Sequence, residues 1–434
     1  ELNGITNAGK SASKKRGNSL FSGGVGEGGL GVGAFEMKLG EYFPNSNTWD
    51  EVNGAGALKG NFFFSEEMVC LGQEIKRIKS GSDEIWTTLN QLQRRGDVVY
   101  ALDQGNPVTI GLNQTINQTL QINGTAWFWH DRIGYLIQAG TTTDIKLIGE
   151  RRSLHPVLMQ DEHYRDALSQ EDRDLGSINM FQLAINHGTD PTNDRYVYKV
   201  IPDISLADFQ QYTSPSIVAR NSNKIQAVSN PADSVLQVVF YEPGSLALWG
   251  GKSVAVDKKA IIMLRQSQGE LFVSVANPVH RGLTPSFVES NSPTIGELYT
   301  DPVNVTLGNF GIAGETEGTY VVPVQLPVDR GYEGQTVTEV VQFKTDGGLP
   351  TDIEGIVGAS PTRIYPNPHT HVIDIEPAPF MEKLELFDLE GKQILVLPIN
   401  GRKRIRLDSK LPQGTYLLKL SGRSGTETHK IVKQ

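Results

Sequence analysis

Residues 126–137 read Ala-Trp-Phe-Trp-His-Asp-Arg-Ile-Gly-Tyr-Leu-Ile, and this stretch decides the fold class. Two runs of apolar and aromatic residues, which favour strands, flank the polar residues His130, Asp131 and Arg132. Such runs joined by a short polar turn are typical of a β-hairpin. Trp127 and Trp129 fall on one face of the first strand, because side chains alternate along a strand. We expect this aromatic stripe to lie in a core, with stacking on a sugar as the alternative.

Similar strand-like runs extend on both sides of this hairpin. Those nearest to it are at 61–64, 68–75, 85–92, 180–186 and 195–201, and we expect the last two to pair around the turn at 187–191. A second series, from 217 to 344, has runs at 225–228, 235–241, 259–265, 271–276, 303–307 and 337–343. One short helix is expected at 205–212, with Ser205 as its N-cap. The sequence therefore predicts an all-β protein.

The composition excludes several classes of protein. The chain has 434 residues, which predicts about two to four domains. Its net charge is −9 with both signs scattered, so we expect no nucleic-acid partner, and a polyanionic substrate would have to meet local basic patches. No run approaches the roughly 20 apolar residues that span a membrane. The 46 glycines and 22 prolines are typical of many short strands joined by tight turns.

The single cysteine, Cys70, excludes an intrachain disulfide. It lies in the apolar run Met-Val-Cys-Leu at 68–71, which favours a buried structural thiol over a nucleophile.

A glycine-rich stretch at 26–31 satisfies the pattern GxGxxG. A dinucleotide site needs a helix directly after this pattern, whereas the residues at 32–39 are strand-like. We therefore interpret the stretch as a flexible loop that could face a saccharide cleft.

Histidines and acidic loops provide few candidates for a metal site. His130, His155, His163 and His187 show no ligand spacing, so no metal site and no cofactor are expected. His163-Tyr164-Arg165 imitates a lyase constellation, yet neighbouring residues on a strand point to opposite faces. The acidic loops at 161–162 and 171–174 leave calcium open, although interleaved arginines favour solvated ion pairs.

The C-terminal residues resemble the C-terminal sorting domain of type IX secretion cargo. The likeness rests on Ile-Tyr-Pro-Asn-Pro at 364–368, Leu-Glu-Leu-Phe-Asp-Leu-Glu-Gly-Lys at 384–392, Leu-Pro-Gln-Gly-Thr-Tyr-Leu-Leu-Lys-Leu at 411–420 and His-Lys-Ile-Val-Lys-Gln at 429–434. It implies an immunoglobulin-like β-sandwich, recognition by the type IX machinery and export across the bacterial outer membrane. The implied sorting signal comprises Pro366, Asn367, Pro368, Gly414, Tyr416 and Lys430. A generic immunoglobulin-like module is the alternative.

Residues 21–343 resemble the β part of the family 8 polysaccharide lyases, the chondroitin, hyaluronan and xanthan lyases. The likeness rests on segments in the family's order, at 21–25, 33–37, 59–75, 127–137, 186–202, 216–228 and 237–241. It implies β-elimination at a uronate, for which the family uses an asparagine, a histidine, a tyrosine, an arginine and a glutamate. In the family, most of these residues lie on a helical domain that precedes the β region. We therefore expect the catalytic residues upstream of Glu1, and we assign no catalytic or substrate-binding residue here.

These likenesses together predict four segments. They are a large antiparallel supersandwich at 1–214, a smaller β-sandwich at 215–345, a linker at 346–358 and the sorting domain at 359–434. The predicted function is the non-catalytic part of a secreted lyase, with an acidic polysaccharide and the protein's own N-terminal helical domain as partners. The alternative is a secreted carbohydrate-binding or adhesion protein without a catalytic domain.

Overall fold

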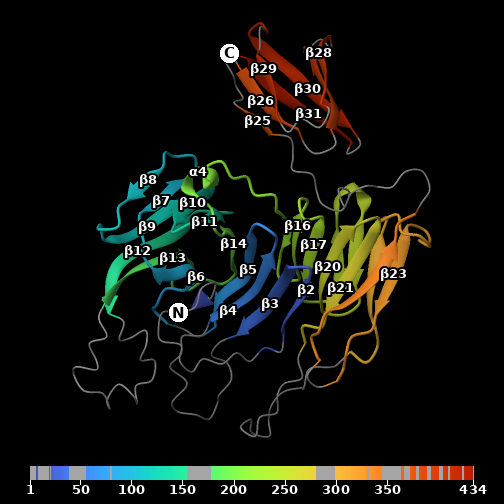
Figure 1. Cartoon of the computed structure of the whole chain (residues 1–434), viewed down its shortest axis with the longest axis horizontal. Coiled ribbons are helices and arrows are strands. Elements are labelled where there is room, and N and C mark those ends of the chain that lie inside the picture. The colour runs from blue at the N-terminus through green and yellow to red at the C-terminus, as the bar shows by residue number, and fades with distance from the viewer. Residues whose placement is uncertain are drawn as a thin grey trace.

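The computed structural model describes residues 6–7, 19, 21–38, 55–78, 81–153, 177–279, 299–329 and 332–344, and in the C-terminal part 363–365, 372–377, 381–388, 392–399, 404–408, 411–422 and 425–433. Within these residues the strands form six antiparallel sheets (Figure 1). The helical elements described are the short helix α4 (Leu206–Phe209) and one 3-10 turn (Trp249–Gly251). No described helix has the length and apolar character needed to cross a membrane. The predicted all-β fold class is confirmed.

The first sandwich consists of a nine-stranded and a five-stranded sheet. The nine-stranded sheet has the order β2 (Ser22–Glu27), β3 (Leu30–Lys38), β4 (Ala55–Phe63), β5 (Met68–Arg77), β14 (Asp194–Ile201), β11 (Ile133–Gln138), β10 (Thr125–His130), β7 (Val98–Leu102) and β8 (Val108–Ile110). The five-stranded sheet has the order β1 (Thr6–Asn7), β6 (Trp86–Gln93), β13 (Ser177–Asn186), β12 (Thr143–Ser153) and β9 (Ile116–Ile122). Phe128 and Tyr135 of the larger sheet share one buried core with Phe181 and Leu183 of the smaller.

The predicted hairpin at 126–137 is formed by β10 and β11. Its last pair is His130 with Ile133, so Asp131 and Arg132 form a two-residue turn. Both have positive φ, 47° and 64°, as the type I′ turns that close most tight hairpins require. His130, which we expected in the turn, is instead buried and stacks on Phe181 with ring centroids 4.4 Å apart. It belongs to the strand because the turn needs only two residues.

The two tryptophans of this hairpin lie outside the sandwich core. Alternation along β10 turns Phe128 inward and leaves both tryptophans on the opposite face, partly buried. There Trp127 packs edge-on against Phe209 of α4, with ring centroids 5.8 Å apart. The Trp129 indole N–H donates to the Ile204 carbonyl at 3.0 Å. The expectation that the stripe lies in the core is therefore corrected: it anchors the segment around α4 to the sheet.

The helix itself is shorter than expected, but its start is as predicted. Ser205 is the N-cap, and its hydroxyl accepts the Asp208 N–H at 3.1 Å.

Two further predictions are wrong in the same part of the fold. The stretch at 26–31 is not a flexible loop: β2 and β3 form a hairpin whose turn is Gly28-Gly29, with φ of 62° and 84°. The strands around 187–191 do not pair with each other. β13 pairs with β12 and β6, whereas β14 pairs with β11 and β5. The two strands belong to different sheets, because the chain crosses from one sheet to the other at residues 187–191.

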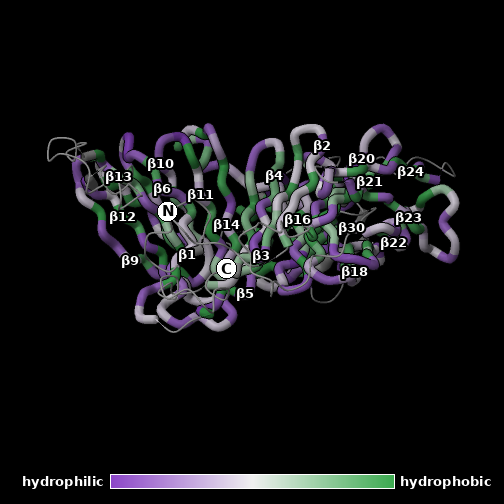
Figure 2. The backbone as a smooth tube through the Cα atoms, turned by 90° about the horizontal axis from the view of Figure 1, so that it is seen from below, coloured by the Kyte–Doolittle hydropathy of each residue, from purple (hydrophilic) through white to green (hydrophobic). Residues whose placement is uncertain are grey.

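The second β region adds a six-stranded and a four-stranded sheet. The six-stranded sheet has the order β15 (Ile217–Asn221), β16 (Ile225–Asn230), β17 (Val235–Phe240), β20 (Ala260–Ser267), β21 (Glu270–Ala276) and β24 (Val337–Gln342). The four-stranded sheet has the order β18 (Gly244–Ala247), β19 (Ser253–Val256), β22 (Val303–Gly308) and β23 (Thr319–Val324). Figure 2 shows hydrophobic residues gathered along the strands and mostly hydrophilic residues in the loops.

Both faces of the six-stranded sheet are covered in its middle. Leu236 and Val238 of β17 belong to the core shared with the four-stranded sheet, whereas Val235 and Val239 pack with Phe62 of the nine-stranded sheet. Every residue of β16 and of β17 is buried as a result. β17 accordingly reads as the nearly continuous apolar run Val-Leu-Gln-Val-Val-Phe, as expected for a strand that is covered on both faces.

The contact between the nine-stranded and six-stranded sheets also carries buried polar groups with partners. The Tyr241 hydroxyl donates to the Gln226 side-chain oxygen at 2.8 Å. The buried Glu67 carboxylate accepts the Ser214 hydroxyl at 2.6 Å and the Ser216 N–H at 3.1 Å. Because buried polar groups are costly without hydrogen bonds, this network fixes how the two regions pack around residues 214–216.

Cys70 is buried as predicted, in the core of the first sandwich. Burial raises the pKa of its thiol to about 12, against the lowering effects of a hydrogen bond with Tyr198 and of the charge of Lys59. A thiol with so high a pKa is a poor nucleophile at neutral pH.

The C-terminal part forms a separate small sandwich, which stands apart from the other sheets in Figure 1. One sheet has the order β25 (Arg363–Tyr365), β26 (Val372–Glu376) and β29 (Ile405–Asp408). The other has the order β28 (Gln393–Pro398), β27 (Met381–Phe387), β30 (Gly414–Gly422) and β31 (Gly425–Lys433). Their shared core includes Ile373, Leu384, Leu418 and Ile431. The linker predicted at 346–358 lies outside the described residues.

Candidate functional site

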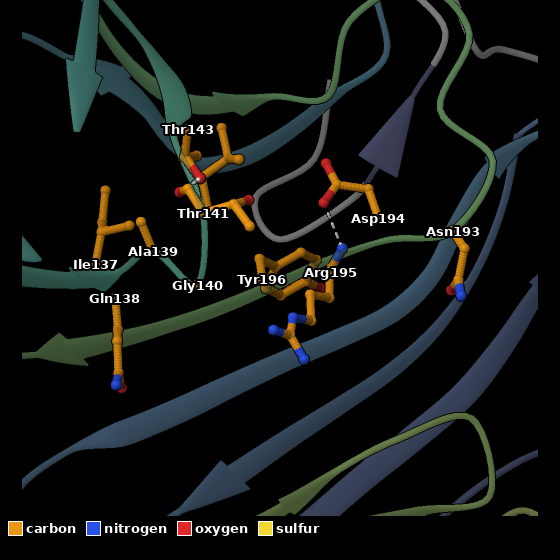
Figure 3. A pocket seen from close by; sticks show the side chains of 11 residues that line it. Ile137, Gln138, Ala139, Gly140, Thr141, Thr143, Asn193, Asp194, Arg195 and Tyr196 are labelled. Atoms are coloured by element: carbon orange, nitrogen blue, oxygen red, sulfur yellow. Dashed lines mark hydrogen bonds between the residues drawn. The ribbon is translucent and has the colours of Figure 1, made fainter. Parts of the chain in front are cut away.

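A polar pocket opens at one end of the first sandwich, where the nine-stranded and five-stranded sheets meet (Figure 3). Ile137 of β11 and Tyr196 of β14 line it from the larger sheet, and Thr143 and Ile185 line it from the smaller one. The loop that joins β11 to β12 closes one side with Thr141. The pocket has a volume of about 160 Å³.

The pocket combines a buried apolar part with a polar rim. Ile137, Ile185 and Tyr196 are buried, whereas Asn193 and Arg195 at the start of β14 are exposed. An amide and a guanidinium therefore face solvent beside an apolar surface. Small-molecule sites in proteins commonly have this character.

Asp194, between those two rim residues, is held in place by hydrogen bonds. One carboxylate oxygen lies 2.6 Å from His187 Nδ1, and the other accepts the Arg195 N–H at 2.7 Å. Partial burial alone would raise the pKa of Asp194, but the hydrogen bonds and charges of His187 and Arg195 outweigh it and hold the pKa below its ordinary value. The carboxylate is therefore ionised at neutral pH.

His187 continues this network into the protein interior. Its Nε2 lies 2.9 Å from the Thr87 hydroxyl, which gives the order Thr87, His187, Asp194. The order imitates a hydrolase triad, in which the hydroxyl must reach a substrate. Here Thr87 is 0% exposed and the His187 side chain is fully buried. The array therefore orients Asp194 and the start of β14 and has no access to a substrate.

Asp194→Asn is expected to lower the thermal stability of the chain at about pH 7 and to matter less in acid. Because the folded-state pKa lies below the unfolded one, this group stabilises the fold above the unfolded pKa, and the contribution is lost as the pH falls through the folded pKa. Melting temperatures of wild type and variant at about pH 7 and about pH 3 test this. The control is Asp190→Asn, which changes an exposed residue in the loop between β13 and β14. A melting-temperature difference that stays the same at both pH values would contradict the account.

A second hollow, of about 170 Å³, is less suited to a ligand. Its Arg94 is buried, and the guanidinium donates to the carbonyls of Gly111 at 2.7 Å and Gln114 at 2.6 Å. Burial lowers the pKa of Arg94, with the charge of Asp97 opposing this effect. The two terminal nitrogens of the guanidinium thus bind carbonyls of the segment at 110–114.

Three of the predicted sorting residues lie on neighbouring strands. Gly414 begins β30, and Tyr416 is buried two residues later, with its hydroxyl donating to the Pro412 carbonyl at 2.7 Å. Lys430 lies on β31 opposite Leu417 and is exposed, whereas the next residue, Ile431, is buried. Pro366, Asn367 and Pro368 lie outside the described residues. The assignment of a sorting signal to these six positions stays a prediction.

The structure does not test the remaining metal-site candidates from the sequence. His155, His163 and the acidic loops at 161–162 and 171–174 lie outside the described residues. Within the part of the chain that the structure describes, no group of three or more histidine, cysteine, aspartate or glutamate residues could hold a metal ion. The pocket of Figure 3 could not be predicted from the sequence, because no motif connects its loops at 139–143 and 193–195.

Comparison with known proteins gives matches along most of the chain. Residues 1–213 match the family model for the polysaccharide lyase family 8 super-sandwich domain, and residues 217–285 match the model for that family's C-terminal β-sandwich domain. Residues 363–434 match a secretion system C-terminal sorting domain. The layered β-sandwich chain thus belongs to polysaccharide lyase family 8. Its C-terminal part is a type IX sorting domain, so the protein is exported by that system.

Individual relatives agree with this placement. The chain is 27% identical over 273 residues to Chondroitinase-AC of Pedobacter heparinus, which covers 62% of this chain and 34% of that protein. A chondroitinase AC lyase structure, solved in complexes with oligosaccharides, matches 74% of this chain and 40% of its own at 24% identity and a TM-score of 0.55. The structure of a Paenibacillus xanthan lyase matches 99% of this chain and 44% of its own, at 15% identity and a TM-score of 0.56. These structures support the fold. The chain spans about a third of the length of the curated relative.

Proposed function

We propose that the chain is the β-sheet part of an extracellular lyase that cleaves a uronate-containing polysaccharide by β-elimination. The observation that carries this proposal is the succession of two family 8 matches, in order, over the two β regions that pack through a common core. The relative named Chondroitinase-AC supports a glycosaminoglycan-like substrate.

The chemistry of elimination requires specific groups in the site. A base removes the proton at C5, the C4–O bond breaks, a C4–C5 double bond forms, and the leaving oxygen takes up a proton. Because a proton next to a carboxylate is barely acidic, the carboxylate's charge must be offset and an accessible base provided. Among the described residues of both β regions, His130 and His187 are the histidines, and both are buried.

The tyrosines of the nine-stranded sheet are equally unsuited to act as a base. Burial raises the pKa of Tyr135 to about 12 and raises the pKa values of Tyr196 and Tyr198 well above their ordinary value. We therefore propose that the catalytic groups lie in a helical domain outside residues 1–434, and that the β regions support that domain and its substrate cleft.

The polar pocket of Figure 3 favours a binding function as a second candidate. A secreted carbohydrate-binding or adhesion protein would use such a pocket without any catalytic domain.

Product analysis of the protein extended upstream of Glu1 separates these functions. With hyaluronan, chondroitin or xanthan, elimination is expected to give oligosaccharides that end in an unsaturated uronate and are lighter by one water than hydrolysis products. Mass spectrometry of the digest measures this difference. Hydrolysis products would contradict the lyase proposal, and binding without any cleavage would support the adhesion alternative.

A further inference from the structure

We propose that the polar pocket where the nine-stranded and five-stranded sheets meet binds the oxyanion, a carboxylate or a sulfate, of one acidic sugar unit, with Arg195 as its main ligand. This inference rests on the proposed function for its substrate class. The proposed binding site lies in the first sandwich, within residues 1–434.

The Arg195 guanidinium lies against a glycine. A Cβ built on Gly140 would lie 2.9 Å from Arg195 Nη2, so the guanidinium lies over the bare backbone of this residue. Figure 3 shows Arg195 and Gln138 extending to the same side of their strands, while Asp194 extends to the opposite side. The exposed guanidinium therefore lies beside the loop at 139–143, at the rim of the pocket.

The guanidinium is also available to a ligand. None of the ion pairs found among the described residues involves the Arg195 guanidinium. The nearest candidate, Asp194, uses one oxygen for His187 and the other for the Arg195 backbone N–H. The negative charge of Asp194 opposes an incoming anion, and these two hydrogen bonds offset part of that charge.

The chemistry of the rim fits an acidic sugar. A guanidinium presents a planar fork that binds carboxylate and sulfate oxygens in pairs. The Thr141 hydroxyl and the Asn193 amide, both at exposed positions, supply further groups that match ring hydroxyls. The volume of about 160 Å³ is well below the ~300–1,000 Å³ of pockets for drug-sized ligands. The pocket therefore accommodates one charged sugar unit and leaves the rest of a polysaccharide in solvent.

Binding of labelled oligosaccharides to the 434-residue chain tests the site. Fluorescence anisotropy with a hyaluronan hexasaccharide, a chondroitin sulfate hexasaccharide and the neutral chitohexaose distinguishes carboxylate, sulfate and uncharged ligands. We expect the acidic sugars to bind and chitohexaose not to. Arg195→Ala is expected to weaken binding about tenfold, through loss of a charge-assisted pair of hydrogen bonds. Tighter binding of the sulfated sugar would identify the sulfate as the group that is bound, and equal binding of both acidic sugars would identify the carboxylate.

Two further variants separate geometry from charge. Gly140→Ala keeps every charge but displaces the guanidinium, so it should weaken binding about threefold. Arg220→Ala removes an exposed arginine on β15 and should leave binding unchanged. Equal binding of an acidic sugar by wild type and Arg195→Ala, or equal binding of chitohexaose, would overturn the proposal. Cleavage by the longer protein is measured separately, so a lyase with an inert pocket refutes only the subsite.

Discussion

Deletion of Thr428 to Gln434 is expected to stop export, so that the protein accumulates in the periplasm. The deleted residues form most of β31, which is the edge strand next to β30 in its sheet. An edge strand presents unpaired backbone groups on its outer side, which makes it a ready surface for recognition. The two β regions should stay folded after the deletion, because their cores contain no residue of the C-terminal sandwich.

The deletion also removes Ile431 from the sorting-domain core, so a milder variant is needed to separate recognition from folding. Lys430→Glu changes an exposed side chain on the same strand and should reduce export while the domain stays folded. Lys392→Glu makes the same change of charge at an exposed turn and should be exported normally. Cell fractionation with immunoblotting of the periplasm, the cell surface and the medium measures each variant. Export of the deletion variant at the level of the intact protein would show that this strand is not needed for sorting.

Local structure could be predicted from the sequence where the pattern and the physics agree. In the hairpin at 126–137, two apolar runs and a polar turn are sufficient, and the observed strands end within two residues of the expected positions. The N-cap at Ser205 and the buried thiol of Cys70 were predicted for the same reason: each depends on near neighbours in the sequence.

Features that depend on distant segments could not be predicted in this way. The continuous burial of β17 arises because a second sheet covers its other face, and no local pattern identifies that sheet. Trp127 and Trp129 were misplaced because their cover, the segment around α4, comes from more than 70 residues further along the chain. The pocket with Arg195 was missed because it forms where two loops from different parts of the sequence meet.

The largest contrast that we expect is in lyase activity itself. The chain of 434 residues should show no elimination activity, whereas the protein extended upstream of Glu1 should be active. The physical reason is that enzymes gain many orders of magnitude in rate from positioned charges and bases, and their loss leaves only slow background chemistry. Among the described residues, the histidines of the two β regions are buried, and Tyr135, Tyr196 and Tyr198 of the nine-stranded sheet have raised pKa values.

Each elimination leaves an unsaturated uronate that absorbs in the near ultraviolet, so absorbance reports the reaction directly. The decisive measurement follows absorbance over time for both proteins, at equal concentration, with hyaluronan, chondroitin and xanthan. Circular dichroism of the shorter chain confirms that it is folded. We expect a steady rise with at least one polysaccharide for the longer protein and a flat trace for the 434-residue chain. A steady rise with the 434-residue chain alone would contradict the claim that this β assembly supports catalysis without performing it.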